Sequence, residues 1–403
     1  MYLYSKHIYF PNQIKREGYL EIKEGIITGF HKEIEDKEFV DYGEYHLVPG
    51  FIDQHLHGWA TGSYMNQRDE RAVMEMKKYL PYAGVTGFLA TSGADNLDNI
   101  CEGIKICDKI VKEQKEDGAT LLGVHLEGPF INKKRKGMQR EEYCINPDFD
   151  IMKRFLRCAT EKNLIRLMTI APELEGSLEV IKLCKEENVQ LSIGHSEASF
   201  ETISEMKEHG LGGVTHMFSG MSGLQHRNLG VAGTALYYDD LYCEFAKQTG
   251  MTVLFEAFHI AYRVKGPDRI IMTTDNGGLA QTTQERYHYV RKQTFIPDGD
   301  ELIVRNEDGS EYRLNRTKFE DVKDLELSYI KSIQNLVKNV HPSIHDVMKM
   351  TSENPAKYLS VYDRKGSLEV GKDADILVVD PQFNLYATYC MGKKYVYEED
   401  FNV

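Results

Sequence analysis

The stretch that decides the fold of this chain reads Val48-Pro49-Gly50-Phe51-Ile52-Asp53-Gln54-His55-Leu56-His57-Gly58. An apolar run opens the segment, and two histidines close it. Residues two apart on an extended chain project to the same side, so His55 and His57 can both face one point beyond the strand. The segment therefore predicts a buried strand that delivers a pair of candidate metal ligands.

On the C-terminal side of this segment, short apolar runs alternate with longer amphipathic stretches. We expect barrel strands at residues 48–52, 85–89, 121–126, 164–170, 190–193, 213–215, 242–246 and 270–274. Apolar residues recur at helical spacing in several of the intervals, at residues 68–79, 98–115 and 178–187. This alternation is typical of βα units around a parallel sheet, and eight such units close a (β/α)8 barrel of the TIM type.

Both ends of the chain read instead as short strands separated by turns. These strands are expected at residues 3–8, 20–22 and 26–28, and again at residues 374–379, 385–388 and 394–397. We therefore predict a small β-sandwich domain that both termini complete, with residues 1–48 and 361–403, and a barrel domain with residues 49–360.

Polar side chains recur where the predicted barrel strands end, which is where a barrel places its functional groups. Taken singly, each could be a buried polar group satisfied by backbone carbonyls. Together, imidazoles and carboxylates suit Zn²⁺ or Fe²⁺ better than Mg²⁺. The residues that we expect to hold one or two such ions are His55, His57, Glu127, His195, His216 and Asp275.

The charge and residue composition of the chain argue against some classes of binding partner. The formal net charge of -13 argues against a nucleic-acid partner, because phosphate backbones are bound by clustered Lys and Arg. The basic run at residues 133–136 is short and favours a solvated loop over an anion-binding loop. Seven scattered cysteines without a C-x-x-C pair, no signal-like N-terminus and no apolar stretch of membrane-spanning length predict a cytoplasmic protein without a membrane partner.

Five segments recur together, and in order, in a known family. They are residues 49–58, His125-Leu126-Glu127-Gly128-Pro129-Phe130, Ile193-Gly194-His195-Ser196, Thr215-His216-Met217-Phe218 and residues 366–375. On these segments the chain resembles the N-acetylglucosamine-6-phosphate deacetylases of the amidohydrolase superfamily. The resemblance implies hydrolysis of the acetyl amide of N-acetylglucosamine 6-phosphate, which gives glucosamine 6-phosphate and acetate.

The same resemblance implies roles for the residues at the strand ends. Glu127, His195 and His216 would hold one metal ion. His55 and His57, with Glu127 bridging, would hold a second ion, and some members of the family lack this pair and work with one ion.

Two further residues match functional positions of the family. Asp275 matches the acid/base carboxylate. Arg227 matches an arginine that contacts the sugar phosphate across a dimer interface, so the resemblance also implies a homodimer. His125 and Asp53 lie beside the motifs, and we expect them either to orient ligands or to be buried groups satisfied by the backbone.

The chain departs from the family at several substrate positions. Ser219 and Gly220 stand where the family has Asn-Ala, Gln139 replaces a histidine that faces the substrate, and Lys247-Gln248-Thr249-Gly250 replaces an Asp-Gly-x-His motif. The residues that we expect to contact the substrate are Arg227, Ser219, Gly220, His226, Gln139 and Lys247. The departures predict weak activity on N-acetylglucosamine 6-phosphate and leave room for preference for a related N-acyl amino sugar or its phosphate.

Two other functions remain open from the sequence. The first is a cyclic-amide or N-acyl hydrolase of the same superfamily that acts on a substrate without phosphate. The second is a metal-binding scaffold without catalysis, against which the presence of every expected metal-site residue argues.

Overall fold

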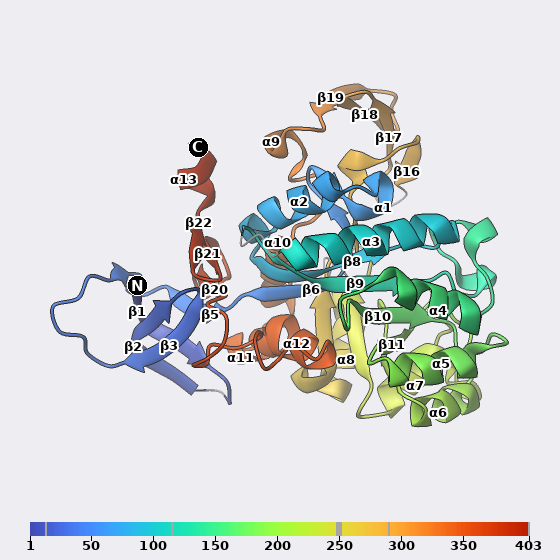
Figure 1. Ribbon diagram of the computed structural model, residues 1–403, viewed down its shortest axis with the longest axis horizontal. Helices are drawn as coiled ribbons and strands as arrows, with labels where there is room; N and C mark the ends of the chain where they lie inside the picture. The colour runs from blue at the N-terminus through green and yellow to red at the C-terminus, as the bar shows by residue number, and fades with distance from the viewer. Residues whose placement is uncertain (13, 114–116, 247–251, 289–290, 402–403) are drawn as a thin grey trace.

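The computed structural model describes residues 1–12, 14–113, 117–246, 252–288 and 291–401. A barrel of strands with helices around it forms the larger body, and a layer of strands built from both ends of the chain stands beside it (Figure 1). Among the described helices, none combines the length and apolar composition needed to cross a membrane.

The large sheet runs around the barrel in the order of the chain. Its strands are β6 (Phe51–Trp59), β8 (Val85–Ser92), β9 (Thr120–Glu127), β10 (Ile165–Ile170), β11 (Gln190–Ile193), β12 (Leu211–Val214), β13 (Tyr242–Ala246), β14 (Ile270–Thr273) and β15 (Asn276–Gly277), with β7 (Gly62–Ser63) beside β6. β15 follows β14 after Thr274 and Asp275 and pairs in parallel with β6, with Asn276 opposite Leu56. The two ends of the sheet therefore meet, which confirms the predicted barrel.

The barrel strands form where the sequence is apolar without alternation, because a parallel sheet inside a barrel is buried on both faces. β8, for example, is buried at every position. The first predicted strand, residues 48–52, is wrong at its start, since the chain changes sheet at Gly50. A Cβ at Gly50 would lie 2.2 Å from Thr86 Oγ1, so glycine is required where the chain crosses between the sheets.

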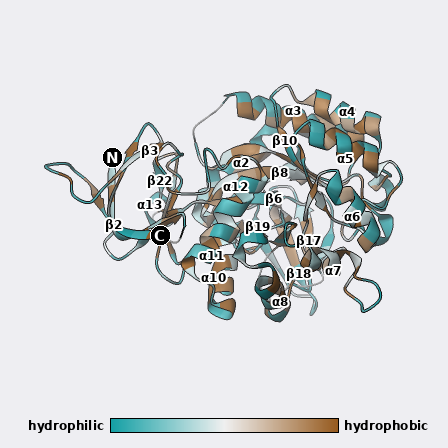
Figure 2. Cartoon of the chain, turned by 90° about the horizontal axis from the view of Figure 1, so that it is seen from below, coloured by the Kyte–Doolittle hydropathy of each residue, from teal (hydrophilic) through white to brown (hydrophobic). Residues whose placement is uncertain are grey.

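Helices cover the outside of the barrel and follow the strands in turn. They are α1 (Tyr64–Gln67), α2 (Glu70–Tyr79), α3 (Leu97–Glu113), α4 (Phe149–Cys158), α5 (Ser177–Glu186), α6 (Phe200–Glu208), α7 (Gly230–Tyr237), α8 (Phe255–Lys265), α9 (Phe319–Val322), α10 (Tyr329–Val340), α11 (Ile344–Met348) and α12 (Asn354–Tyr358). A π-helical turn, Lys349–Glu353, joins the last two. Several outer helices carry a hydrophobic and a hydrophilic stripe, as burial of one face requires (Figure 2).

The terminal strands form one continuous sheet with a core of its own. Along the sheet lie β22 (Lys393–Tyr395), β21 (Leu385–Cys390), β20 (Ile376–Val379), β5 (His46–Pro49), β1 (Tyr2–Phe10), β2 (Ile14–Lys23) and β3 (Ile26–His31), with β4 (Val40–Asp41) beside β1. Leu3, Leu20 and Ile376 are among the buried residues that its two ends share. A small β-domain from both termini is thus confirmed, although the last predicted strand is wrong at its end, where α13 (Tyr397–Phe401) begins. The boundaries at residues 48/49 and 360/361 stay a prediction.

An antiparallel sheet that the sequence analysis did not predict is inserted between β14 and α10. Its strands are β16 (Arg286–His288), β17 (Gln293–Asp298), β18 (Glu301–Asn306) and β19 (Glu311–Asn315), and it stands at the top of Figure 1. Phe295, Leu302 and Val304 bury one face of this sheet in the main core. The insertion is therefore packed on the barrel and not a solvated loop.

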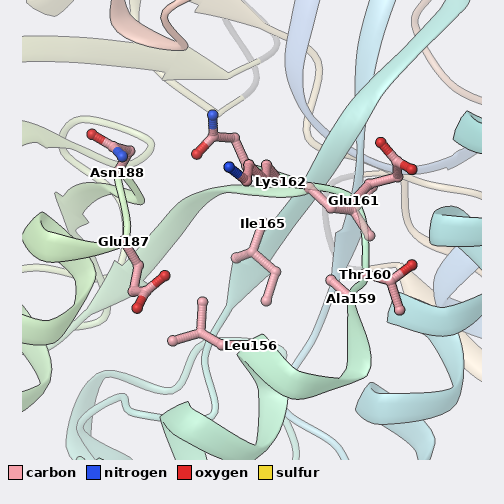
Figure 3. A pocket seen from close by; sticks show the side chains of 10 residues that line it. Leu156, Ala159, Thr160, Glu161, Lys162, Ile165, Glu187 and Asn188 are labelled. Carbon is pink, nitrogen blue, oxygen red and sulfur yellow. The ribbon is translucent and has the colours of Figure 1, made fainter.

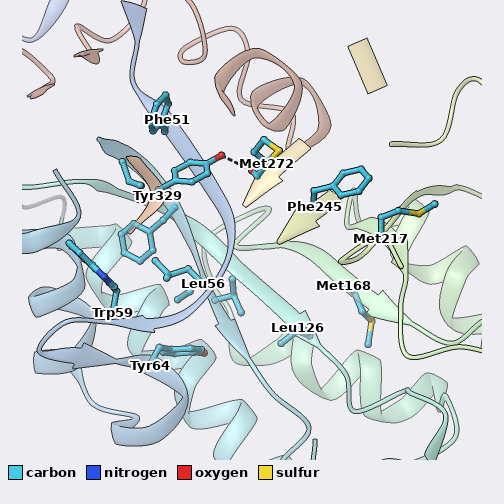
Figure 4. Close-up of a cluster of buried hydrophobic side chains, with 14 of the residues drawn as sticks. Phe51, Leu56, Trp59, Tyr64, Leu126, Met168, Met217, Phe245, Met272 and Tyr329 are labelled. Carbon is cyan, nitrogen blue, oxygen red and sulfur yellow. Dashed lines mark hydrogen bonds between the residues drawn. The ribbon is translucent and has the colours of Figure 1, made fainter. Parts of the chain in front are cut away.

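The main hydrophobic core fills the space within the barrel wall and beneath the helices (Figure 4). Phe51 and Leu56 of β6 lie in it beside Tyr329 of α10. The Tyr329 hydroxyl donates a hydrogen bond of 2.6 Å to the backbone carbonyl of Met272 in β14. This bond fixes the helix that follows the inserted sheet to the strand that precedes it.

Candidate metal centre

The imidazoles of four histidines converge on the carboxylate of Glu127, which ends β9. Glu127 Oε1 lies 3.1 Å from the Nε2 atoms of His195 and His216 and 3.4 Å from His55 Nε2. Glu127 Oε2 lies 3.2 Å from His57 Nε2. Strands β6 and β9 and the residues after β11 and β12 supply these side chains, so the structure brings the expected residues together from four strands of the barrel.

The cluster consists of two groups that share one carboxylate. Within each group, the candidate ligand atoms all lie within 4.8 Å of one another. One group contains His55, His57 and Glu127, and the other contains Glu127, His195 and His216. All five side chains are buried, so they form an enclosed site that could hold one metal ion or two.

The far nitrogen of each ring shows that Nε2 is the atom available to a metal. The Nδ1 atoms of His57, His195 and His216 bond the backbone carbonyls of Thr91, Arg135 and Ser219 at 3.0, 2.7 and 3.0 Å. A carbonyl oxygen only accepts, so Nδ1 of each of these rings carries a proton, and Nε2, which faces Glu127, is the nitrogen left to bind a metal. Such outer partners are the usual support of metal-binding histidines, and the residues therefore fit a divalent ion.

Glu244, in β13, is a residue of the site that the sequence analysis missed. Its Oε1 atom accepts a hydrogen bond of 2.8 Å from His55 Nδ1, and its Oε2 atom accepts one of 2.7 Å from Gln54. Oε1 also accepts the backbone N–H of His216 at 3.1 Å. One buried carboxylate thus orients a histidine of the first group and the backbone of the second. The position of Glu244 inside an otherwise apolar predicted strand could have indicated its role, because a buried charge needs polar partners.

The charges around the cluster favour a cation. Burial alone would raise the pKa of Glu127, but His55, His195 and His216 hold it well below its usual range. Burial alone would lower the pKa of His55, but Asp275, Glu127 and Glu244 raise it well above its usual range. The carboxylates that favour a proton on this ring equally favour a metal ion beside it.

Asp275 follows β14 and stands at the rim of the cluster. Its Oδ1 atom lies 3.3 Å from His57 Nε2 and 3.5 Å from His55 Nε2. The Asp275 side chain is 31% exposed, whereas the Glu127 side chain is 3% exposed. A carboxylate that reaches both the histidines and the solvent is suited to proton transfer.

Buried groups hold the backbone around Asp275. Asp53 accepts hydrogen bonds from Thr274 through its backbone N–H at 3.2 Å and its hydroxyl at 2.7 Å. On the other side, Glu326 accepts the backbone N–H groups of Gly277 and Leu279 at 2.7 and 2.9 Å. Asp53 therefore positions Asp275, and Glu326, which the sequence analysis did not single out, positions the turn after it.

Three of the converging residues have left-handed backbone conformations, with φ of 49° at His195, 32° at His216 and 50° at Asp275. A side chain other than glycine in this region costs on the order of 1–3 kcal/mol. Such conformations persist where surrounding contacts determine them, and they gather at functional sites.

The predicted substrate residues fall into two sets. Gln139 donates a hydrogen bond to Glu127 Oε2 and accepts the backbone N–H of Ala94 at 2.8 Å. A Cβ at Gly220 would lie 3.2 Å from His195 Nδ1. Gln139, Gly220 and Ser219, whose carbonyl accepts from His216, are therefore beside the cluster.

Among the described residues, His226 and Arg227 do not join the buried cluster. His226 and Arg227 are exposed in a turn in which Gln225 and Asn228 pair. Lys247, which we also expect to contact the substrate, lies outside the described residues. His125 is fully buried, and burial together with the nearby His55 holds its pKa well below the usual range. It contacts the hydroxyls of Thr91 and Thr169, so it supports the barrel wall as a neutral ring.

A separate pocket lies away from this centre. It has a volume of about 300 Å³ and lies where the chain enters β10 and β11, between α4 and the end of α5 (Figure 3). Leu156, Ile165 and Asn188 are among its lining residues. It is at the amino ends of the strands, whereas the metal-binding candidates are at their carboxyl ends.

The sequence of this chain is similar to those of known amidohydrolases. The model of the amidohydrolase family matches residues 308–395. N-acetylglucosamine-6-phosphate deacetylase from Bacillus subtilis is 32% identical over 390 residues, which cover 94% of this chain and 93% of the relative. The deacetylase of the same name from Lysinibacillus sphaericus is 30% identical, with 86% of this chain and 84% of the relative covered.

A solved structure shows the same similarity in three dimensions. The crystal structure of N-acetylglucosamine-6-phosphate deacetylase from Thermotoga maritima superposes with a TM-score of 0.79 at 28% sequence identity. The match covers 98% of this chain and 99% of that one. Fold and sequence therefore correspond over nearly the full length of both proteins.

Proposed function

This chain belongs to the N-acetylglucosamine-6-phosphate deacetylase family of amidohydrolases, and we propose that it removes the acetyl group from N-acetylglucosamine 6-phosphate to give glucosamine 6-phosphate and acetate. The observation that carries the proposal is the convergence of four histidines on Glu127, with Asp275 at the rim. A metal-binding scaffold without catalysis would not require a partly exposed carboxylate beside both groups.

We assign the ligands of a divalent metal accordingly. Glu127, His195 and His216 would hold one ion, and His55 and His57, together with Glu127, would hold a second. Imidazole and carboxylate ligands suit Zn²⁺ or Fe²⁺. When bound, such an ion supplies Lewis acidity, which polarises an amide carbonyl and makes water acidic near neutral pH.

Asp275 moves the proton. It accepts a proton from the attacking water and delivers it to the departing amine nitrogen, so that the C–N bond breaks to acetate and an amino sugar. Thr274, the residue before Asp275, donates two hydrogen bonds to Asp53. These bonds keep the Asp275 carboxylate in place while it accepts the proton and while it delivers it. No covalent bond between the chain and the substrate is required.

The phosphate of the substrate is assigned to Arg227 of a second copy of the chain, in a homodimer. Exposed apolar side chains before and on the helices that follow its turn support this assembly, because exposed apolar surface that gathers in patches marks interfaces. They are Leu224, Tyr237, Leu254, Ile260 and Val264, on α7, α8 and the segments before them. Gln139, Ser219, Gly220 and His226 are assigned to the remainder of the substrate. The free thiols of all seven cysteines support a reducing compartment, which we take to be the cytoplasm.

Substrate preference tests the proposed function directly. Purified protein is expected to release acetate from N-acetylglucosamine 6-phosphate with a higher kcat/KM than from N-acetylglucosamine, because the phosphate adds charge-assisted hydrogen bonds. The difference should be about tenfold or more and should shrink in Arg227→Ala. The measurement is acetate release for both sugars and for other N-acetylhexosamine phosphates. Equal values for the phosphorylated and plain sugars would contradict the phosphate assignment.

Metal content tests the two-ion assignment. The double variant His55→Ala/His57→Ala is expected to lose one metal ion and to keep the other, because Glu127, His195 and His216 remain. Elemental analysis after desalting gives the ions per chain. A matched double variant, His341→Ala/His345→Ala, removes two histidines outside the cluster and should keep the full content. Full metal content in the His55/His57 variant would show that this pair binds no ion.

A further inference from the structure

Arg286, the first residue of the inserted sheet, reaches the rim of the metal centre from two sides. Its Nη2 atom lies 3.9 Å from Met138 Sδ, in the loop after β9. Its Nη1 atom lies 3.6 Å from the point where a Cβ on Gly277 would stand. The guanidinium therefore spans the loops that follow two different barrel strands.

Both of these loops carry residues of the site. Met138 precedes Gln139, which bonds Glu127, and Gly277 lies two residues after Asp275. β15, which contains Gly277, also pairs with β6, and Gly277 is opposite Gly58, the residue after His57. Arg286 therefore lies at the carboxyl ends of the barrel strands, beside two loops that carry residues of the site.

This guanidinium has no ion-pair partner within the described parts of the chain. The other arginines of the inserted sheet do: Arg305 pairs with Glu311 at 2.6 Å, and Arg313 pairs with Asp298 at 2.8 Å. Arg286 is nevertheless half-buried, and its one described polar contact is to a thioether, which is a weak acceptor. Glu326 Oε1 lies 3.8 Å from the same point at Gly277, but it accepts the backbone N–H of Gly277 and forms no ion pair with Arg286. A half-buried guanidinium without an ion-pair partner is suited to an anionic ligand.

A second cation lies on the same loop. Lys136 is half-buried, and its Nζ atom donates to the Gln139 carbonyl at 3.4 Å. Its neighbours Lys134 and Arg135 are paired with Glu197, but Lys136 forms no ion pair among the described residues. The loop that the sequence suggested to be solvated therefore contributes the half-buried cation of Lys136 to this part of the molecule.

We infer that Arg286 binds the phosphate of the substrate within the same chain, with Lys136 beside it. The inference rests on the proposed function and deepens it, since it adds a phosphate contact that does not need the partner subunit. Planar guanidinium groups match phosphate oxygens in a bidentate manner, which gives selectivity for phosphate over a neutral hydroxyl.

Binding of glucose 6-phosphate, which has no amide, tests the site apart from turnover. Isothermal titration calorimetry of the metal-loaded protein is expected to give tighter binding of glucose 6-phosphate than of glucose. Arg286→Ala should weaken glucose 6-phosphate binding about 10- to 100-fold, and Arg286→Lys should restore part of it. Arg305→Ala, on the same sheet, is the matched control and should stay within about twofold of the wild type.

The outcomes separate this inference from the proposed function. Unchanged binding of glucose 6-phosphate in Arg286→Ala, or equal binding of glucose and glucose 6-phosphate by the wild type, overturns the phosphate site. Arg286-dependent binding without acetate release from N-acetylglucosamine 6-phosphate supports the site and overturns the proposed function. A matching loss for glucose in Arg286→Ala would show that the residue only holds the inserted sheet in place, and would also overturn the inference.

Discussion

Replacement of Asp275 by asparagine is expected to lower kcat for amide hydrolysis by about a hundredfold to ten-thousandfold, the usual contribution of a general acid–base group. The amide is nearly the same size and cannot relay a proton. Metal should remain at the group of Glu127, His195 and His216, which does not contain Asp275. Steady-state acetate release and the metal content of the same preparation provide the measurement.

A control for this variant comes from another strand end. Asp95 follows β8, where it pairs with Arg68, and it is not part of either metal-binding group. Asp95→Asn makes the same chemical change and should keep kcat near that of the wild type. If Asp275→Asn retained near-normal kcat with its metal in place, another group would have to move the proton.

The second large effect is expected at Glu127, the one side chain common to both metal-binding groups. Glu127→Gln keeps the shape but removes the charge that faces the Nε2 atoms of four histidines. Both ions should be lost or much weakened, and kcat/KM should fall on the order of a thousandfold, because metal polarisation is worth several kcal/mol. Metal content after desalting and acetate release are to be measured together.

The matched control for Glu127 is another buried carboxylate. Asp108, in α3, accepts the backbone N–H groups of Thr160 and Glu161 at 2.8 and 2.7 Å and is not in either metal-binding group. Asp108→Asn should retain full metal content even if it lowers the melting temperature. Two ions still bound to Glu127→Gln would mean that the shared carboxylate is not a ligand of both.

Most barrel strands could be located from the sequence because burial on both faces makes each one a continuous apolar run. Because the residues on both sides of Gly50 are apolar and buried, the sequence does not show that the chain passes there from the small sheet to the barrel. Val48 and Phe51 are equally apolar and equally buried, although one lies in the small sheet and the other in the barrel. Only the pairing partners of β5 distinguish them, and partners distant in sequence leave no local pattern.

The inserted sheet has a local sequence pattern that indicates hairpins. Asp298-Gly299 and Asp308-Gly309 stand at the turns between β17 and β18 and between β18 and β19, with φ of 59° at Gly299 and 83° at Gly309. Asp-Gly between extended segments is a strong indication of a hairpin. What the sequence could not give is the position of this sheet against the barrel, and hence the proximity of Arg286 to the metal centre.

The histidines and Glu127 could be predicted as one cluster because parallel strands bring their carboxyl ends together. Glu244 and Glu326 could not, since their importance depends on contacts across the barrel. Glu244 reaches His55 from a strand far away in sequence, and Glu326 reaches Gly277 from the loop before α10. Residues that position ligands are thus defined by packing, whereas the ligands themselves follow the strand pattern.

The place of β5 in the small sheet has a consequence for protein synthesis. β5 lies between β1, which the ribosome makes before it, and β20, which is made only after the whole barrel. At about 5–20 residues per second, the nascent chain waits on the order of tens of seconds before β20 can pair with β5. Throughout that time the backbone edge beside Leu47 and Val48 is open to another chain. Nascent copies on neighbouring ribosomes are thus exposed to mispairing at this edge until residue 379 has emerged.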